Sequence, residues 1–226
     1  MNKLSLLIFF VFFPLFALSD GWNESEYQAI EQAIEQPRIA DRSVVITKFG
    51  AKTTGSAAQN QRAIQKAIAF LARQGGGKVV VPAGKWHTGA LRLSSGIELV
   101  VSKDALLQFV FERSLYPLVK TSWEGMMCWN YSPCIYSFGS DDVVVSGEGT
   151  IDGGGSNETW WPMCGKEVFG YVKGVTKEAQ VLGSRRRLQQ MAEDDVPWDE
   201  RHFGLGYGLR PQLINFVKGN RVRSEE

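Results

Sequence analysis

The first part of the chain has helical and strand-like spacing of apolar residues. Residues 24–36 carry apolar side chains every three or four positions and end before a proline, which predicts a short amphipathic helix. A second helix is predicted from about residue 59 to residue 74, with one apolar face. Gly75-Gly76-Gly77 would end it, because glycine adopts the backbone angles that close a helix.

From Lys78 onward the pattern changes to short apolar runs separated by glycine or polar turns, which predict strands. A sandwich, a barrel and a parallel β-solenoid all contain such strands. Two features favour the solenoid. First, no Asn-Gly or Asp-Gly turn joins two of these runs; the one such pair nearby, Asp152-Gly153, is not followed by a strand. Second, a helix before the runs would cover one end of a stacked core. The expected strands are residues 44–46, 79–81, 90–93, 97–101, 105–111, 134–138, 143–145 and 150–151.

Residues 160–208 interrupt the strand pattern and predict a helical insertion. Residues 176–193 are helical in character and carry Arg185-Arg186-Arg187, which we interpret as a solvated face rather than a site for an acidic polymer, because acidic residues lie nearby. Strand-like runs return at residues 213–217 and 221–223. A solenoid that ends on a strand has no cap, so its apolar interior is expected to be open to water or to another chain.

Residues 4–18 are apolar except for Ser5 and follow a single cation, Lys3. A charged start, an apolar stretch and small residues around Ser19 are typical of a secretory signal peptide. The stretch is shorter than the roughly 20 residues that a membrane-spanning helix needs. We therefore expect a signal peptide at residues 1–19, a secreted or periplasmic location, and no membrane association after its removal.

The composition is that of a globular chain, with 44% hydrophobic residues. There are 25 basic and 24 acidic side chains, and loss of Lys3 with the signal peptide makes them equal, so no overall field favours a nucleic-acid partner. We expect a helical segment at residues 20–42 and one partial β-solenoid domain at residues 43–226. The cysteines Cys128, Cys134 and Cys164 allow one disulfide at most, and no Cys or His spacing indicates a metal site.

Several short blocks follow one another in a fixed order between residues 44 and 222. They are Phe49-Gly50-Ala51-Lys52, residues 61–68, residues 75–84, residues 88–93, Trp123-Glu124-Gly125, residues 130–133, residues 147–155, Trp160-Trp161-Pro162 and Leu209-Arg210-Pro211. In this order they resemble the N-terminal portion of glycoside hydrolase family 28, a polygalacturonase-like group within the pectate-lyase-like β-helix superfamily. Thr53-Thr54-Gly55 departs from the Gly-Asp-Gly that the family usually carries.

The resemblance implies an all-β fold, a right-handed parallel β-helix with an N-terminal capping helix, that hydrolyses galacturonan or a related pectic backbone without a cofactor. The chemistry that it implies is inverting hydrolysis of O-glycosyl bonds. In that reaction one carboxylic acid protonates the leaving oxygen while a second carboxylate activates water across the sugar ring.

The residues to which the resemblance assigns this chemistry are missing. Family members carry an Asn-Thr-Asp, a following Asp-Asp pair, a Gly-His-Gly and an Arg-Ile-Lys, all after the Arg-Pro block. This sequence has no Asn-Thr-Asp and no Arg-Ile-Lys, neither His87 nor His202 lies between glycines, and fifteen residues follow Pro211. We therefore assign no catalytic residue and expect an N-terminal fragment of such a hydrolase, inactive by itself.

Other polar and aromatic positions have both a functional and a structural interpretation. Asp141-Asp142, Asp152 and Asp194-Asp195 are interpreted as turn residues, because each pair or residue stands where a strand or helix meets a turn. His87 is expected to be a surface or packed histidine, whereas His202, in the insertion, is a candidate for lining a cleft. The rings of Trp123, Trp129, Trp160 and Trp161 would suit sugar stacking, with packing as the default interpretation.

Two alternatives remain open. One is a non-catalytic β-solenoid that binds polysaccharide or serves as an adhesin. The other is a relative that acts by β-elimination, which would need Ca²⁺ and clustered carboxylates, and the sequence offers no candidate cluster.

Overall fold

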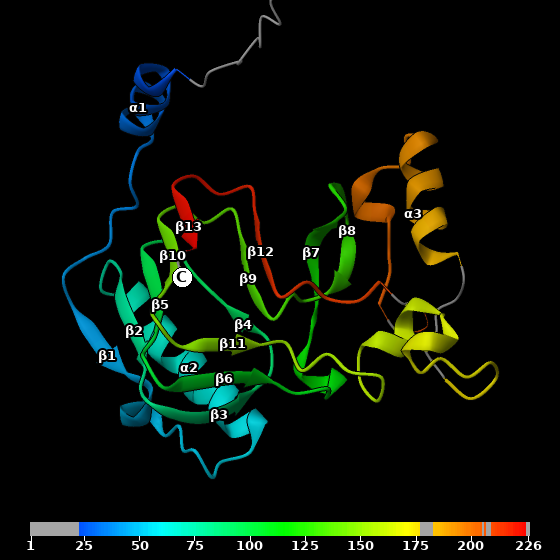
Figure 1. Cartoon of the computed structure of the whole chain (residues 1–226), viewed down its shortest axis with the longest axis horizontal. Coiled ribbons are helices and arrows are strands. Elements are labelled where there is room, and N and C mark those ends of the chain that lie inside the picture. The colour runs from blue at the N-terminus through cyan, green and yellow to red at the C-terminus, as the bar shows by residue number, and fades with distance from the viewer. Residues whose placement is uncertain (1–22, 177–182, 205, 207–208, 225–226) are drawn as a thin grey trace, which may run out of the picture. The chain divides into compact units, whose positions relative to one another are not determined.

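The computed structural model describes residues 23–176, 183–204, 206 and 209–224 (Figure 1). The chain divides into two units, residues 1–35 and residues 36–226. In the first unit the predicted amphipathic helix is present as α1 (Glu24–Ala33), where the Asn23 side chain accepts a hydrogen bond from the Ser25 N–H at 3.1 Å. Tyr27 and Ile30 on this helix are more than half exposed.

The predicted signal peptide, residues 1–19, lies outside the described residues. Within the described part, no helix is both long enough and apolar enough to cross a membrane. The domain boundaries expected at residues 20–42 and 43–226 stay predictions.

The second unit consists mainly of parallel strands in three stacked sheets, which confirms a β-helix of parallel strands. The chain visits the sheets in turn, so that β2, β3 and β4 form one coil, β5, β6 and β9 the next, and β10, β11 and β12 a third. The sheet orders are β1-β2-β5-β10-β13, β11-β6-β3 and β12-β9-β4. The strands of these sheets are β1 (Ser43–Val45), β2 (Gly77–Val81), β3 (Gly84–Thr88), β4 (Leu91–Arg92), β5 (Ile97–Val101), β6 (Ala105–Phe109), β9 (Ile135–Phe138), β10 (Val143–Ser146), β11 (Thr150–Asp152), β12 (Ile214–Val217) and β13 (Val222–Ser224).

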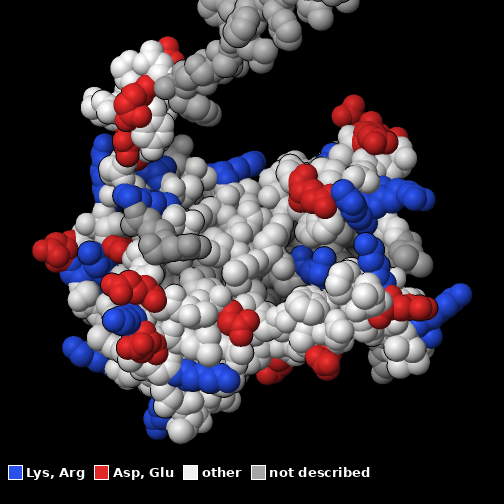
Figure 2. All heavy atoms as spheres, viewed as in Figure 1, with Lys and Arg blue, Asp and Glu red and all other residues white. Residues whose placement is uncertain are grey.

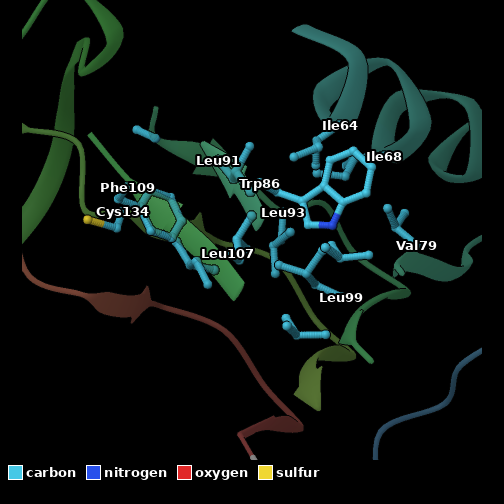
Figure 3. Packing of buried hydrophobic residues seen from close by; sticks show 14 of the residues in the cluster. Ile64, Ile68, Val79, Trp86, Leu91, Leu93, Leu99, Leu107, Phe109 and Cys134 are labelled. Atoms are coloured by element: carbon cyan, nitrogen blue, oxygen red, sulfur yellow. The ribbon is translucent and has the colours of Figure 1, made fainter. Parts of the chain in front are cut away.

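The core lies between the three sheets, where side chains of one register position stack from coil to coil (Figure 3). Trp86, Leu107 and Ile151 form one such column, because β3, β6 and β11 pair in register. In β2, β5 and β6 buried and partly exposed residues alternate strictly, since successive side chains of a strand point to opposite faces. Each strand therefore gives one face to the core and the other to the surface.

Helix α2 (Ala57–Ala72) packs Ile64 and Ile68 against the first coil (Figure 3). It begins at Ser56, whose hydroxyl accepts a hydrogen bond from the Gln59 N–H at 3.2 Å. The Gln61 amide donates to the carbonyls of Ala90 and Leu115 at 2.7 and 2.8 Å, and Gln65 exchanges two hydrogen bonds with the backbone of Arg92. These bonds satisfy coil carbonyls that the helix would otherwise cover.

The predicted glycine stop of α2 is confirmed. The Gly76 N–H donates to the Leu71 carbonyl at 2.9 Å, and the φ of Gly76 is +101°. A Cβ at this position would stand 2.4 Å from the Gly96 carbonyl oxygen, so only glycine fits where the helix exit meets the next coil.

The structure also contains an antiparallel hairpin that the sequence analysis did not predict, formed by β7 (Leu118–Trp123) and β8 (Met126–Tyr131). Its turn residues Glu124 and Gly125 have φ values of +47° and +82°. A two-residue turn with two positive φ values matches the twist of the flanking strands, and Asn-Gly or Asp-Gly is its usual sequence. Glu124 stands where asparagine or aspartate is usual, so a search for Asn-Gly or Asp-Gly does not detect this hairpin.

The region predicted as a helical insertion contains α3 (Ser184–Glu193), which confirms the predicted helix from residue 184 on; residues 177–182 lie outside the described residues. Leu188 of α3 packs with Phe203 and Leu209 against Cys128 of the hairpin in a second apolar cluster. The backbone of Trp129 also exchanges hydrogen bonds with Arg201 and Phe203, both at 2.8 Å. The remaining short helices are η1 (Ile46–Phe49), η2 (Arg113–Leu115), η3 (Trp161–Cys164), η4 (Glu167–Phe169) and η5 (Trp198–Glu200).

All three cysteines are free thiols, with Cys128 and Cys134 buried and Cys164 partly exposed. The structure therefore contains none of the disulfides that the cysteine count allowed.

Candidate functional site

The outer face of the sheet β12-β9-β4 carries a column of polar side chains. Leu91, Ile135 and Ile214 point into the core, so the next residues along each strand point outward. These outward residues are Arg92, Tyr136 and Asn215, which share one register position.

The hairpin is fixed beside this face by bonds to the backbone of β7. The Tyr136 hydroxyl donates to the Lys120 carbonyl, and the side-chain amides of Gln212 and Asn215 donate to the Ser122 carbonyl at 2.6 and 3.1 Å. In Figure 1 the hairpin accordingly stands between β12 and α3. It forms a wall at the edge of the sheet face.

Two lysines and three aromatic rings gather between the sheet and this wall. The Lys120 Nζ lies 5.5 Å from the ring centre of Trp129 and 5.2 Å from that of Trp198. The Lys218 Nζ lies 5.6 Å from the ring centre of Trp198 and 5.8 Å from that of Phe138. We call Lys120, Trp129, Phe138, Trp198 and Lys218 the lysine–tryptophan face.

The charges of this face are available to a ligand. Both lysines are exposed, and within the described part of the chain neither forms an ion pair with a carboxylate. A cation–π contact stabilises the position of an exposed ammonium group by about 0.5–1 kcal/mol and leaves its charge unneutralised. Together with the partly exposed rings of Trp129 and Trp198, the arrangement suits a ligand that combines negative charge with apolar ring surfaces.

His202, the residue expected to line a cleft, lies at this face. Its ring stacks on Trp129 with centroids 5.9 Å apart and an interplanar angle of 8°. At the Arg92 end, a cavity of about 530 Å³ borders the same sheet and is lined in part by Gln65, Arg92 and Tyr136.

Burial makes two groups near this face poor acids. It raises the pKa of Tyr136 to about 12, against the opposing effect of Arg92, and it raises the pKa of Cys128 to about 11, against the opposing effect of Arg201. Both groups are therefore neutral at ordinary pH, and neither is suited to proton transfer there.

Asp141 and Asp142 serve as turn residues, as interpreted from the sequence. One oxygen of Asp141 accepts from the backbone and side-chain N–H groups of Asn220, both at 2.9 Å. Asp142 accepts from Arg221 at 2.6 and 3.0 Å and from the Arg38 backbone at 2.9 Å. These bonds tie one coil turn to the next and to the chain before β1.

The structure brings His87 and Asp152 to one column on the outer face of the sheet β11-β6-β3, with Gln108 between them. Asp152 accepts from the Gly154 N–H at 2.8 Å and from the Gln108 amide at 2.6 Å, and these bonds lower the pKa of its carboxyl group. Asp194 and Asp195 are exposed at the end of α3. None of these residues lies on the lysine–tryptophan face, and among the described residues no three His, Cys, Asp or Glu side chains form a metal-binding group.

The four tryptophans weighed from the sequence have different surroundings. Trp160 is buried, with its ring edge-on to those of Phe111 and Tyr116, so the faces of this ring are not open to sugar stacking. The Trp123 indole N–H donates to the Arg210 carbonyl at 3.2 Å, and Trp161 is 42% exposed. Trp129 lies on the face described above.

Sequence reasoning missed Lys120, Trp198 and Lys218. None of the three belongs to a local sequence motif, and nearly a hundred positions separate Lys120 from Lys218. The only signal that places Lys120 is the alternation within β7, which becomes visible once the hairpin is known.

Figure 2 shows basic side chains gathered over the region of α3, where the three consecutive arginines lie. Arg185 forms an ion pair with Glu124 of the hairpin turn at 2.8 Å, and both side chains are well exposed. Arg185 thus links the arginine run to the turn of the hairpin.

The stacked sheets define the chain as a parallel β-helix protein, and comparisons with known proteins identify its relatives. No protein-family model matches the chain. A probable polygalacturonase from Vitis vinifera is 32% identical over 155 residues, which are 64% of this chain and 31% of the relative. A hyperthermoactive exopolygalacturonase from Thermotoga maritima matches with a TM-score of 0.80 and 34% identity over 89% of this chain and 44% of its own.

A putative glycosyl hydrolase from Parabacteroides merdae shares the fold, with a TM-score of 0.50 and 19% identity over 80% of this chain and 63% of its own. The chain spans less than half the length of the two polygalacturonases that it matches. Over this part, the chain is similar in sequence and in fold to polygalacturonases, and these similarities support the resemblance to glycoside hydrolase family 28 that the ordered blocks indicate.

Proposed function

We propose that this chain is the galacturonan-binding part of a pectin-degrading, polygalacturonase-like glycoside hydrolase. The observation that carries the proposal is the match to the Thermotoga maritima exopolygalacturonase over 89% of the chain at 34% identity. The proposed binding surface is the lysine–tryptophan face.

The chemistry of this face supports an acidic polysaccharide as its ligand. A galacturonan presents a carboxylate on each sugar and an apolar face on each ring. Lys120 and Lys218 supply charges of the opposite sign, and Trp129 and Trp198 supply flat apolar surfaces.

Hydrolysis with inversion needs two carboxyl groups about 6.5–9.5 Å apart on either side of the scissile bond. Asp141 and Asp142 are already bonded to residues of the neighbouring coil turn, and Asp152 is bonded to Gly154 and to Gln108. No Asn-Thr-Asp or Arg-Ile-Lys occurs in the 226 residues. We therefore propose that the acid and the base of the complete hydrolase come from outside these residues. The 226-residue chain should bind the polymer without hydrolysing it.

The first experiment measures binding and hydrolysis with one preparation of folded protein. Affinity electrophoresis in gels that contain polygalacturonate should retard the parent chain. The Lys120→Gln/Lys218→Gln variant should lose at least about tenfold in affinity, since two charged contacts are removed. Arg73→Gln is the matched control, because it removes an exposed cation at the end of α2 and should bind as the parent does.

A reducing-end assay on the same samples should show no release of sugar ends. Hydrolysis by the folded parent chain would contradict the proposed division between binding and catalysis. Normal retardation of the double lysine variant would instead remove the lysine–tryptophan face from the proposal.

The proposal that this chain is a fragment is tested at the gene. Coding DNA beyond the codon for Glu226, read in all three frames, should encode an Asn-Thr-Asp and a Gly-His-Gly. If neither motif is present in any frame, the alternative of a non-catalytic polysaccharide-binding solenoid is favoured. That alternative is also consistent with the lack of both motifs in the present 226 residues.

We also propose that the protein is exported by residues 1–19. N-terminal sequencing of protein recovered outside the cytoplasm should begin close to residue 20. Retention of residues 1–19 on that protein would contradict cleavage.

Two finer features of the fold belong to the same proposal. We propose that the coils wind in a right-handed sense, as crossovers between parallel strands do in nearly all proteins.

We also propose that α2 is the N-terminal cap, which its buried face and its bonds to coil carbonyls support. Ile64→Asp on the buried face should unfold the coil, whereas Lys66→Asp on the exposed face should not.

A further inference from the structure

A second cavity, of about 390 Å³, lies where the loops after β11 and before β12 meet the tip of the hairpin. It shares no residue with the lysine–tryptophan face. Successive residues of β7 point to opposite sides, so Lys120 and Trp123 lie on opposite faces of the strand. Its lining includes Trp123, Glu124, Trp160, Trp161, Arg210 and Gln212.

The lining of this cavity combines aromatic rings with one available cation. Three tryptophans border it, and the Trp161 ring is 42% exposed. Among the described residues, none forms a hydrogen bond or an ion pair with the Arg210 guanidinium. The carboxylate in the lining, Glu124, is paired with Arg185 at 2.8 Å, so it does not neutralise Arg210.

Two buried polar atoms of the lining residues lack a hydrogen-bond partner among the described residues. They are Nε1 of Trp160, a donor in a side chain 6% exposed, and Oε1 of Gln212, an acceptor. The amide nitrogen of Gln212 is already bonded to the Ser122 carbonyl. Buried polar groups in folded proteins nearly always have a partner, so a donor and an acceptor left over beside one cavity point to a hydroxyl-bearing ligand.

We infer that this cavity binds a single uronic acid residue, at a site separate from the lysine–tryptophan face. The carboxylate would bond to Arg210, the ring would lie against Trp161 or Trp123, and hydroxyl groups would reach Trp160 Nε1 and Gln212 Oε1 after a small shift of the covering side chains. The volume falls in the range of small-ligand sites. The choice of a uronic acid among carboxylated ligands rests on the proposed function. The existence of the cavity and of its unbonded polar groups is independent of that proposal.

The test follows the indole N–H signals of ¹⁵N-labelled protein while galacturonic acid is added. The signals of Trp123, Trp160 and Trp161, assigned by Trp→Phe variants, should shift and saturate, and those of Trp129 and Trp198 should shift less. Galactose has the same ring without the carboxylate and should bind at least about tenfold more weakly, because it lacks the charged contact to Arg210.

Arg210→Gln should remove the difference between the two sugars, and Trp161→Ala should weaken both. Arg73→Gln is again the matched control and should behave as the parent chain. Far-ultraviolet circular dichroism of each variant establishes that it is folded; should Arg210→Gln fail to fold, Trp161→Ala, at an exposed ring, carries the test.

The outcomes separate this site from the proposed function. Cavity binding that survives Lys120→Gln/Lys218→Gln but not Arg210→Gln supports the inference, whatever the polymer assay gives. Absence of indole shifts with both sugars, or equal affinity for galactose and galacturonic acid, overturns it. If polymer retardation persists in that case, the proposed function stands without the second site.

Discussion

Asp142 shows how a carboxylate that looks catalytic in the sequence becomes a structural one. Hydrogen bonds from Arg221, and further from the Arg38 backbone, lower its pKa from 3.8 to about 2. A group whose pKa is lower in the folded state stabilises the fold above its unfolded pKa and stops doing so as the pH falls through its folded pKa. The contribution of Asp142 should therefore be complete above about pH 4 and be lost toward pH 2.

Asp142→Asn tests this at the residue scale. Asparagine tolerates the φ of +56° found here, so the change removes charge without straining the turn. We expect the free energy of unfolding at neutral pH to fall by about 1–3 kcal/mol. Urea unfolding at several pH values should also show a smaller loss of stability between pH 4 and pH 2 than in the parent.

Glu148→Gln is the control for this prediction, because Glu148 is an exposed acidic residue of the following turn. It should change the stability by no more than about 0.5 kcal/mol. An unchanged acid transition in Asp142→Asn would show that the Arg221 contact contributes nothing.

At the scale of elements, the hairpin decides where the candidate site stands. Nothing lies within 4 Å of a Cβ added at Gly125, so a substitution there meets only the cost of a positive φ. Gly125→Val should lower the free energy of unfolding by roughly 1–3 kcal/mol, and Gly125→Asn by less, because asparagine visits the left-handed region more readily. Chemical denaturation measures both.

The same pair of variants tests the link between the hairpin and binding. If the hairpin holds Lys120 beside the sheet, Gly125→Val should weaken polygalacturonate retardation more than Gly125→Asn does. Equal stability and equal retardation in the two variants would show that the turn conformation is not what positions this wall.

At the scale of the whole molecule, the net charge of +1 provides almost no long-range attraction for a polyanion. Attraction must then come from local lysines, and it should fall with salt because the screening length shrinks from about 10 Å at 0.1 M to about 3 Å at 1 M. Binding of polygalacturonate measured across this range should weaken steadily in the parent chain. The salt dependence should be shallower in Lys120→Gln/Lys218→Gln, and an identical slope would contradict a role for these charges.

The family resemblance drawn from ordered sequence blocks agrees with the relatives found by comparison. One reason is that the blocks sit at points where the coil leaves little choice of residue. Gly76, in one of them, has no room for a side chain beside Gly96, and Gly154, in another, would place a Cβ 2.3 Å from the Phe109 carbonyl oxygen. At these two positions the stacking of the coils excludes a side chain.

By itself, the sequence determined the α-helices, the apolar face of α2 and most of the strands, because these depend on neighbours a few positions apart. The alternation in residues 97–101 is enough to predict β5 and its buried side. The glycines after residue 74 are likewise enough to predict where α2 ends.

Only the tertiary structure decided which of the polar residues are available to a ligand. Asp142 is occupied by Arg221, 79 positions away, whereas Lys120 meets Trp198 and is left without a carboxylate partner in the described part of the chain. The physical reason is that hydrogen bonds and cation–aromatic contacts act over a few ångströms in space. Distances of that kind between distant parts of a chain are set by coil stacking and by the hairpin, and no local pattern records them.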